Sequence, residues 1–436
     1  METRSLHAMI RFGLGARPEQ APPADPLAWL QAQVTGPAAP LLPPVKGGEH
    51  PSLEECFQIW LEDERDPVPQ GRNARRLALL AQEREALFAQ ALETAAPFRE
   101  RLVLFWANHF TVSRRQGAVV ALAGDHVRSA IRPHVTGPFA ELLLAAALHP
   151  AMLYYLDQTR SIGPGSPVGL RTGRGLNENL AREVLELHTL SPAGGYTQAD
   201  VTQFAALLSG LGVSRNRPPF GTLFRTGAHE PGTKVILGRR FGEGRAQIDA
   251  ALRWLAGHEA THRHLALKLA RHFVADAPPP AVVRRLFGVL RDTGGHLGAA
   301  TLALLEMPEA WEPPLTKLRT PQDFSLAAHR AVGTEAAEAG GALRMAAALG
   351  QPLWAAPAPI GWPDTAAGWT SPEGILRRLD RAYQLAGRHS RLAPMAVLEM
   401  TLGPLARAET VTAIRRAGSP RDGLTLLLGS PEFQRR

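Results

Sequence analysis

Apolar residues recur at spacings of three and four along most of the chain, with Arg and Glu residues on the opposite faces. This spacing places the apolar side chains on one side of an α-helix. The pattern predicts helices at residues 53–64, 72–92, 97–110, 125–135, 139–148, 150–157, 177–190 and 198–212, and over most of the chain after Arg245. The expected fold class is therefore mainly α, a large multi-helix globular domain.

A different pattern interrupts the helices once. Between Arg215 and Gly244 the chain is rich in Gly, Pro and β-branched residues. These residues favour short strands joined by tight turns. We expect a small β-hairpin insertion at about 220–242.

Proline and glycine mark the irregular parts of the chain. Residues 1–50 are predicted to form an irregular N-terminal arm on the surface, with one short helix at Pro26–Val34, because these residues break regular structure. Residues 51–436 are predicted to form a single helical domain, in which Ser161–Gly175 is a glycine-rich loop. The segment Gln351–Trp369 contains three tryptophans among four prolines. Since prolines fix the backbone, we expect this segment to pack against the helical body.

The composition indicates a folded chain without a membrane span. The 436 residues are 45% apolar and 20% charged, which is far from the composition of disordered proteins. Apolar runs are too short for the roughly 20 residues of a membrane helix. The first residues, METRSLHAMIRFGLGARP, lack a continuous apolar stretch, so no secretory or twin-arginine signal is expected and the predicted location is the cytoplasm.

The net charge of +8 is spread along the chain. Arginines make up most of the basic residues, and they are scattered among acidic residues instead of forming clusters. Because phosphate binding needs clustered cations, nucleic acid is not expected as a partner.

Cys56 is the single cysteine, which excludes a disulfide or a thiolate-rich metal site within one chain. It lies among apolar residues and is interpreted as a buried small side chain. Any metal, such as iron, manganese or zinc, must therefore use His and carboxylate ligands. The sequence contains no GxxxxGK[ST] or GxSxG motif, so a nucleotide cofactor is not predicted.

Several longer segments occur in a characteristic order. They are LHAMIRFGLG at 6–15, FWANHFTVS at 105–113, HPAMLYYLD at 149–157, GLNENLAREVLELHTL at 175–190, GGYTQADV at 194–201, and LGQPLW with GWPDTAAGW near the end. Together they resemble the bacterial family called domain of unknown function 1800 over nearly the whole chain. The resemblance implies no activity. It implies that many relatives are exported and stand beside sulfatase-like neighbours, and this chain departs from them by lacking the leader.

The helix that follows Asn177 carries the most specific of these motifs. At 100° per residue, Asn179, Glu183 and Glu186 share one stripe. These side chains could simply be a solvated face, with Arg182 paired nearby. Alternatively, carboxylates one turn apart could converge on a cation, as in helical metal sites. His188 lies too far around the helix to join both carboxylates without a bend.

A second group of polar residues lies in or beside apolar helices. Asn108 and His109 end a strongly apolar helix, so they must be hydrogen-bonded, and His109 is either a satisfied core histidine or a ligand or general base. His149 precedes a helix, where a structural role competes with ligand binding. Asp157 is expected to end that helix facing the glycine-rich loop.

These residues define the predicted site. Glu183, His109, His188 and Asp157 are the candidate catalytic residues. Asn108, Asn177, Asn179, Arg182 and His149 are the candidate ligand-binding residues, and Glu183, Glu186 and His109 are the candidate metal ligands. By contrast, Lys268, His272 and Asp276 share one helical face and are interpreted as surface charges, and the nearby histidines are expected to be exposed.

Two classes of function remain open. One is an enzyme or ligand-binding protein with a His/carboxylate polar or metal site between the helices at 105–110 and 177–188. The other is a noncatalytic helical scaffold that docks a protein partner through Gln351–Trp369. A metal would favour the first class.

Overall fold

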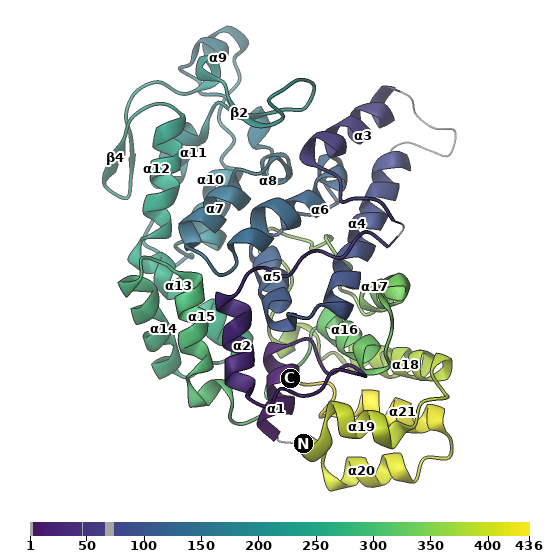
Figure 1. The fold of residues 1–436 in the computed structure, drawn as a ribbon. Helices are drawn as coiled ribbons and strands as arrows, with labels where there is room; N and C mark the ends of the chain where they lie inside the picture. The colour runs from purple at the N-terminus through teal and green to yellow at the C-terminus, as the bar shows by residue number, and fades with distance from the viewer. Residues whose placement is uncertain (1–2, 46, 66–73) are drawn as a thin grey trace.

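The computed structural model describes residues 3–45, 47–65 and 74–436. Helices fill most of this part of the chain, and the strands there form two short antiparallel pairs (Figure 1). The expectation of a mainly α fold with a small β insertion is confirmed.

The α-helices are α1 (Thr3–His7), α2 (Pro26–Thr35), α3 (Leu53–Arg65), α4 (Ala74–Glu93), α5 (Pro97–His109), α6 (Ala123–Asp125), α7 (Phe139–Ala147), α8 (Pro150–Tyr155), α9 (Pro167–Thr172), α10 (Asn179–Glu183), α11 (Gln198–Leu208), α12 (Arg245–Ala256), α13 (Glu259–Phe273), α14 (Pro280–Asp292), α15 (Leu297–Leu305), α16 (Pro321–Ala331), α17 (Ala339–Ala348), α18 (Pro372–Arg388), α19 (Pro394–Thr401), α20 (Ala408–Arg415) and α21 (Pro420–Gly429). Short π-helices extend or connect three of them, at Ala8–Phe12, His126–Ile131 and Val184–His188. Proline stands in the first turn of several helices, where its missing N–H costs no hydrogen bond. The predicted start of α4 at residue 72 lies outside the described residues.

The β region begins earlier than the sequence pattern predicts. Strand β1 (Leu211–Ser214) pairs with β2 (Gly221–Phe224), and β3 (Lys234–Ile236) pairs with β4 (Arg239–Phe241). The helix expected to reach residue 212 ends at Leu208, because Ser209 is extended and Gly210 has a positive φ of 85°. The chain thus enters β1 directly after α11.

The first residues also differ from the expected arm. Residues 3–12 are helical, and Leu6, Ile10 and Phe12 are fully buried. Hydrophobic contacts therefore fix this segment in the interior. The predicted glycine-rich loop is interrupted by the short helix α9, which Ser166 caps by accepting a hydrogen bond from the N–H of Gly169.

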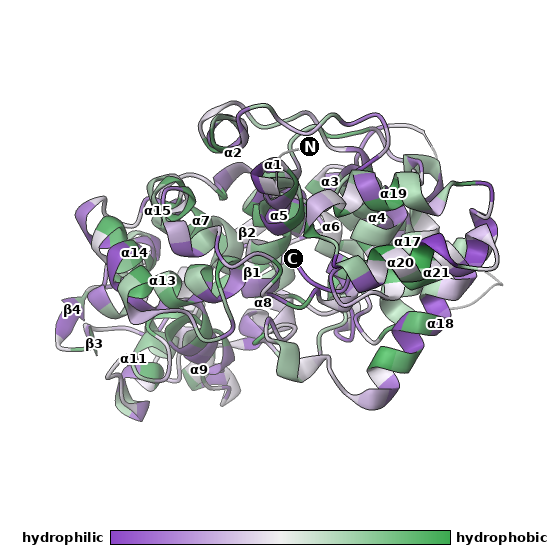
Figure 2. Cartoon of the chain, turned by 90° about the horizontal axis from the view of Figure 1, so that it is seen from below, coloured by the Kyte–Doolittle hydropathy of each residue, from purple (hydrophilic) through white to green (hydrophobic). Residues whose placement is uncertain are grey.

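Buried apolar residues form two clusters. The larger spans most of the chain up to α17, and the smaller joins Ile10 to helices α16–α21. Figure 2 shows that α18 carries strongly apolar and strongly polar residues in turn, as expected for an amphipathic helix. Within the described residues, no helix is long and apolar enough to cross a membrane.

Buried arginines close the C-terminal ends of several helices. Arg11 donates to the carbonyls of Phe273 and Val274 at the end of α13. Arg330 donates to the carbonyls of Ala91 and Leu92 near the end of α4. The last carbonyls of a helix lack partners within the helix and carry partial negative charge. One forked guanidinium can donate to two of these carbonyls at once. Some of the many arginines of this chain therefore have a structural role.

Candidate functional site

A pocket of about 430 Å³ lies beside the larger apolar cluster, which contributes Phe105 and Leu326 to its lining. Helices α5 and α13, the start of α16 and residues 351–365 form its wall. Its charged and imidazole-bearing lining residues are Arg101, His109, Glu186, His264, Lys268, Arg271, His272, Asp323 and Asp364. A concave site of this size with converging polar groups is typical of small-molecule binding.

One stripe of α13 supplies three of these side chains. His264, Lys268 and His272 are four residues apart, so they lie on one face of the helix. The Nε2 of His264 donates to the carbonyl of Leu187 at 3.1 Å, and the Nδ1 of His272 donates to a carboxylate oxygen of Asp364 at 2.9 Å. The interpretation of this face as surface charge is wrong, because it lines the pocket.

Lys268 is the side chain of the stripe without a fixed partner. Among the described residues, its Nζ makes no hydrogen bond and no ion pair. The pKa of the Lys268 ammonium is lowered to about 8, mainly by burial; the Asp364 carboxylate opposes this shift, and Arg271 adds to it. A half-buried amine that faces a cavity without a counter-ion is a candidate functional group.

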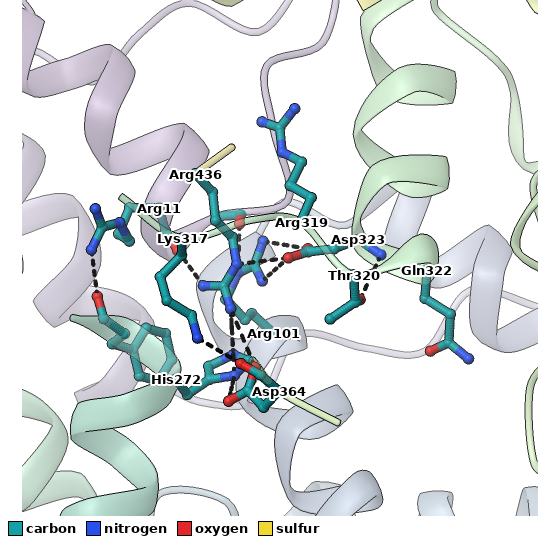
Figure 3. Close-up of polar contacts among 12 residues, drawn as sticks. Arg11, Arg101, His272, Lys317, Arg319, Thr320, Gln322, Asp323, Asp364 and Arg436 are labelled. Carbon is teal, nitrogen blue, oxygen red and sulfur yellow. Dashed lines mark hydrogen bonds and ion pairs between the residues drawn. The ribbon is translucent and has the colours of Figure 1, made fainter. Parts of the chain in front are cut away.

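A buried ion network forms the floor of the pocket (Figure 3). Asp323 contacts the Nη2 of Arg101 at 2.8 Å and the Nε of Arg436 at 2.7 Å. Figure 3 shows Arg436 reaching from Asp323 towards His272 and Asp364. Burial alone would raise the pKa of the Asp323 carboxyl, but the surrounding arginines hold it well below its usual range.

Basic groups outnumber carboxylates around this floor. The buried basic residues are Arg11, Arg101, Lys317, Arg319, Arg378 and Arg436. Asp276, Asp323 and Asp364 are the carboxylates in contact with basic residues of this group. Burial lowers the pKa of His264 and of His272 to about 4, so both imidazoles are neutral at pH 7. The surplus of positive charge lies in the buried network behind the pocket, whereas in the lining Arg101, Lys268 and Arg271 stand against Glu186, Asp323 and Asp364.

The Trp-rich segment closes one side of the pocket, as expected from its prolines. Asn108 fixes it with a pair of hydrogen bonds, in which its Nδ2 donates to the carbonyl of Trp362 at 2.9 Å and its Oδ1 accepts from the N–H of Trp362 at 2.8 Å. Lys317 donates to the carbonyl of Asp364 at 2.6 Å. These bonds place the Asp364 carboxylate beside His272.

Replacing Gly361 with alanine is expected to detach this segment. Gly361 has a φ of 82°, and an added Cβ would lie 2.5 Å from the carbonyl oxygen of Asn108. Limited proteolysis should therefore cut within 351–369 faster in Gly361→Ala than in the unsubstituted protein. Gly350→Ala is the matched control, because Gly350 has a φ of 94° but open space around its Cβ position. Equal cleavage of the two variants would contradict the role given to the Asn108 contact.

The predicted residues His109 and His188 lie together beside the pocket. Their ring centroids are 5.8 Å apart, and the Nε2 of His109 donates to the carbonyl of His188 at 3.2 Å. His188 is the last residue of the π-helix Val184–His188. This change of helix type turns His188 to a different side of the helix than a regular α-helix would. Burial lowers the pKa of His188 to about 3, so this ring is a neutral part of the interior.

The carboxylates of the same helix do not join these histidines. Glu183 is half-buried, and it makes no hydrogen bond within the part of the chain that the structure describes. Burial and the neighbouring Glu186 raise the pKa of its carboxyl. Glu186 reaches the pocket and accepts from the hydroxyl of Tyr196 at 3.3 Å. Glu183 thus forms no hydrogen bond or ion pair with His109, His188 or Arg182, and its role as a catalytic residue or metal ligand stays a prediction.

The remaining predicted residues serve local structure. Asn177 accepts from the N–H of Asn179 at the start of α10, where Asn179 is exposed. Arg182 pairs with Glu178 at 3.0 Å on the surface. These three residues lie outside the pocket lining.

His149 and Asp157 also stand apart from the pocket. His149 caps α8, because its Nδ1 accepts from the N–H of Ala151 while its Nε2 lies 2.9 Å from an Asp125 carboxylate oxygen. Asp157, with a φ of 55°, accepts from the Nε2 of Gln116 at 3.3 Å. Over residues 3–45, 47–65 and 74–436, no three His, Cys, Asp or Glu side chains gather closely enough to hold a metal ion.

The chain is thus a mainly helical protein with a pocket lined by basic, acidic and imidazole side chains. The chain belongs to the DUF1800 family, described as a protein of unknown function, whose model matches residues 7–435. The resemblance drawn from the sequence is thereby confirmed. No curated protein and no solved structure matches the chain.

Proposed function

We propose that the protein binds a small organic anion in the pocket between α5, α13 and the segment 351–365. The single observation that carries this proposal is Lys268, an ammonium group that faces the cavity without a carboxylate partner among the described residues. An anion would supply the missing counter-charge in a site already rich in buried arginine. Binding alone and binding with catalysis both fit this proposal.

Arg271 lies three residues beyond Lys268 on the same helix and also lines the pocket. Its Nε donates to the carbonyl of Asp276 at 3.2 Å, whereas its Nη groups form no hydrogen bond or ion pair with the described residues. Residues three apart are neighbours on a helix surface. Lys268 and Arg271 can therefore hold one carboxylate or phosphate between them.

The scaffold alternative is supported less well. It assigns the partner contact to Gln351–Trp369, and backbone groups of this segment are already bound to Asn108 and Lys317. The metal site and the roles of Glu183 and Glu186 stay predictions, and the anion proposal does not need them.

Thermal unfolding in the presence of oxalate, malonate, citrate or phosphate tests the proposal. At least one of these anions should raise the melting temperature, since a ligand at 100 times its Kd stabilises by about 2.7 kcal/mol. Lys268→Met should remove the shift. Arg263→Met is the matched control, because Arg263 lies on α13 with a side chain 64% exposed. A shift that persists in Lys268→Met, or no shift with any anion, would contradict the proposal.

A further inference from the structure

The geometry points to a covalent role for Lys268: we propose that its Nζ condenses with the carbonyl carbon of a small oxo acid to form an imine. This inference rests on the proposed anion site and adds the chemical class of the ligand. The ligand would carry a carboxylate next to an aldehyde or ketone group.

Lys268 supplies the primary amine of the pocket lining, and an imine can form only on a primary amine, because the nitrogen must lose two protons. The Nε2 of His264 and the Nδ1 of His272 are bound to Leu187 and Asp364. The Nε2 of His109 is bound to the His188 carbonyl. Guanidinium groups stay protonated and are poor nucleophiles. The amine of Lys268 is the group that is free to attack a bound electrophile.

The spacing of Lys268 and Arg271 matches an oxo acid. In such a molecule the carboxylate is one bond from the carbonyl carbon. Side chains three residues apart on a helix have Cβ atoms about 5–6 Å apart, so their long stems can converge on two neighbouring carbons. Arg271 would hold the carboxylate while Lys268 meets the carbonyl carbon.

The reaction balances without an oxidant or reductant. The neutral amine adds its electron pair to the carbonyl carbon, and one amine proton moves to the oxygen to give a carbinolamine. The second amine proton and the hydroxyl then leave as water, and the C–N bond becomes double. The product is an imine and one molecule of water.

The environment increases the fraction of neutral amine. The charged and titratable groups that face Lys268 are His109 from α5, His188 after α10, Arg271 and His264 from α13, and Asp364. With a pKa of about 8, roughly one Lys268 in ten is neutral at pH 7, against fewer than one in a thousand for an ordinary lysine. Desolvated lysines are the usual imine-forming residues.

Reductive trapping tests the inference. The full chain is incubated with glyoxylate and sodium cyanoborohydride at pH 7, and carboxymethylated lysines are located by peptide mass spectrometry. The four lysines are Lys46, Lys234, Lys268 and Lys317, so each gives a separate result. Lys268 should be modified roughly tenfold or more faster than the others, because its amine is partly neutral and faces the pocket. Burial also lowers the pKa of Lys234 and Lys317, but their amines donate to backbone carbonyls. The α-amino group at the N-terminus, with a pKa near 8, also reacts, but peptide mapping distinguishes its modification from that of the lysines.

Two separate measurements distinguish this inference from the anion site. The melting shift of the unsubstituted protein tests the anion site, and the mapping of modified lysines tests the imine. In Lys268→Arg the rapid modification at residue 268 should be lost. If the unsubstituted protein shows the anion shift but modifies Lys268 no faster than Lys234 and Lys317, the imine is overturned and the anion site stands. If neither the shift nor the rapid modification occurs, both proposals fail.

Discussion

Replacing Asp323 with asparagine is expected to lower the free energy of unfolding by about 3–5 kcal/mol, as when one partner of a buried ion pair is removed. Asparagine keeps the shape of the side chain but removes its charge. Arg101 and Arg436, both at most 4% exposed, would then face each other and Arg319 without the carboxylate that separates them. Urea unfolding monitored by circular dichroism measures the change.

Asp292→Asn serves as the control for this experiment. The Asp292 side chain is 64% exposed and pairs with the adjacent Arg291. Exposed substitutions of this kind usually change stability by no more than about 0.5 kcal/mol. A loss in Asp323→Asn no larger than that of the control would show that the buried network does not depend on this carboxylate.

The helical part of the fold could be predicted because its signal is local. Spacing and helix-start residues placed α3, α5 and α7 within one or two residues of their observed bounds. Local spacing failed at residues 3–12, where tertiary packing of Leu6 and Phe12 decides the structure. It also failed at Gly210, where a positive φ ends the helix early.

The site was harder to predict because it is assembled from distant segments. Arg101, Asp323, Asp364 and Arg436 meet through contacts across the chain, and no local pattern joins them. The stripe of Lys268 and its flanking histidines was visible in the sequence, but polarity alone cannot distinguish a pocket wall from a solvated face. The informative signal was the apolar character of the neighbouring α13 positions, which are buried.

A fixed rotation of 100° per residue does not describe the whole helix after Asn177. The change to a π-helix at Val184 alters the phase of the side chains. His188 turns into the interior, and Glu183 is left half-buried without a hydrogen bond among the described residues. A sequence pattern that assumes one helix type cannot show this change.

Lowering the pH from 7.5 to 5.5 is expected to destabilise the protein strongly. Burial lowers the pKa of His7 and His188 to about 3 and that of His264, His272 and His329 to about 4, from 6.5 in the unfolded chain. Between these values the unfolded chain binds more protons than the folded protein, so stability falls as the pH decreases. The full contribution is present above about pH 6.5 and is lost progressively down to about pH 4.

Each of these histidines should cost about 1.4 kcal/mol per pH unit below 6.5. Because five such groups act in the same direction, the free energy of unfolding should be clearly smaller at pH 5.5 than at pH 7.5. Urea unfolding at pH 7.5, 6.5 and 5.5 and constant ionic strength measures the slope. In His264→Gln the amide can still donate to the Leu187 carbonyl. The slope of the unfolding free energy against pH should then correspond to about one proton fewer taken up on unfolding. Equal unfolding free energies at pH 7.5 and 5.5 would mean that these histidines are not held neutral by burial.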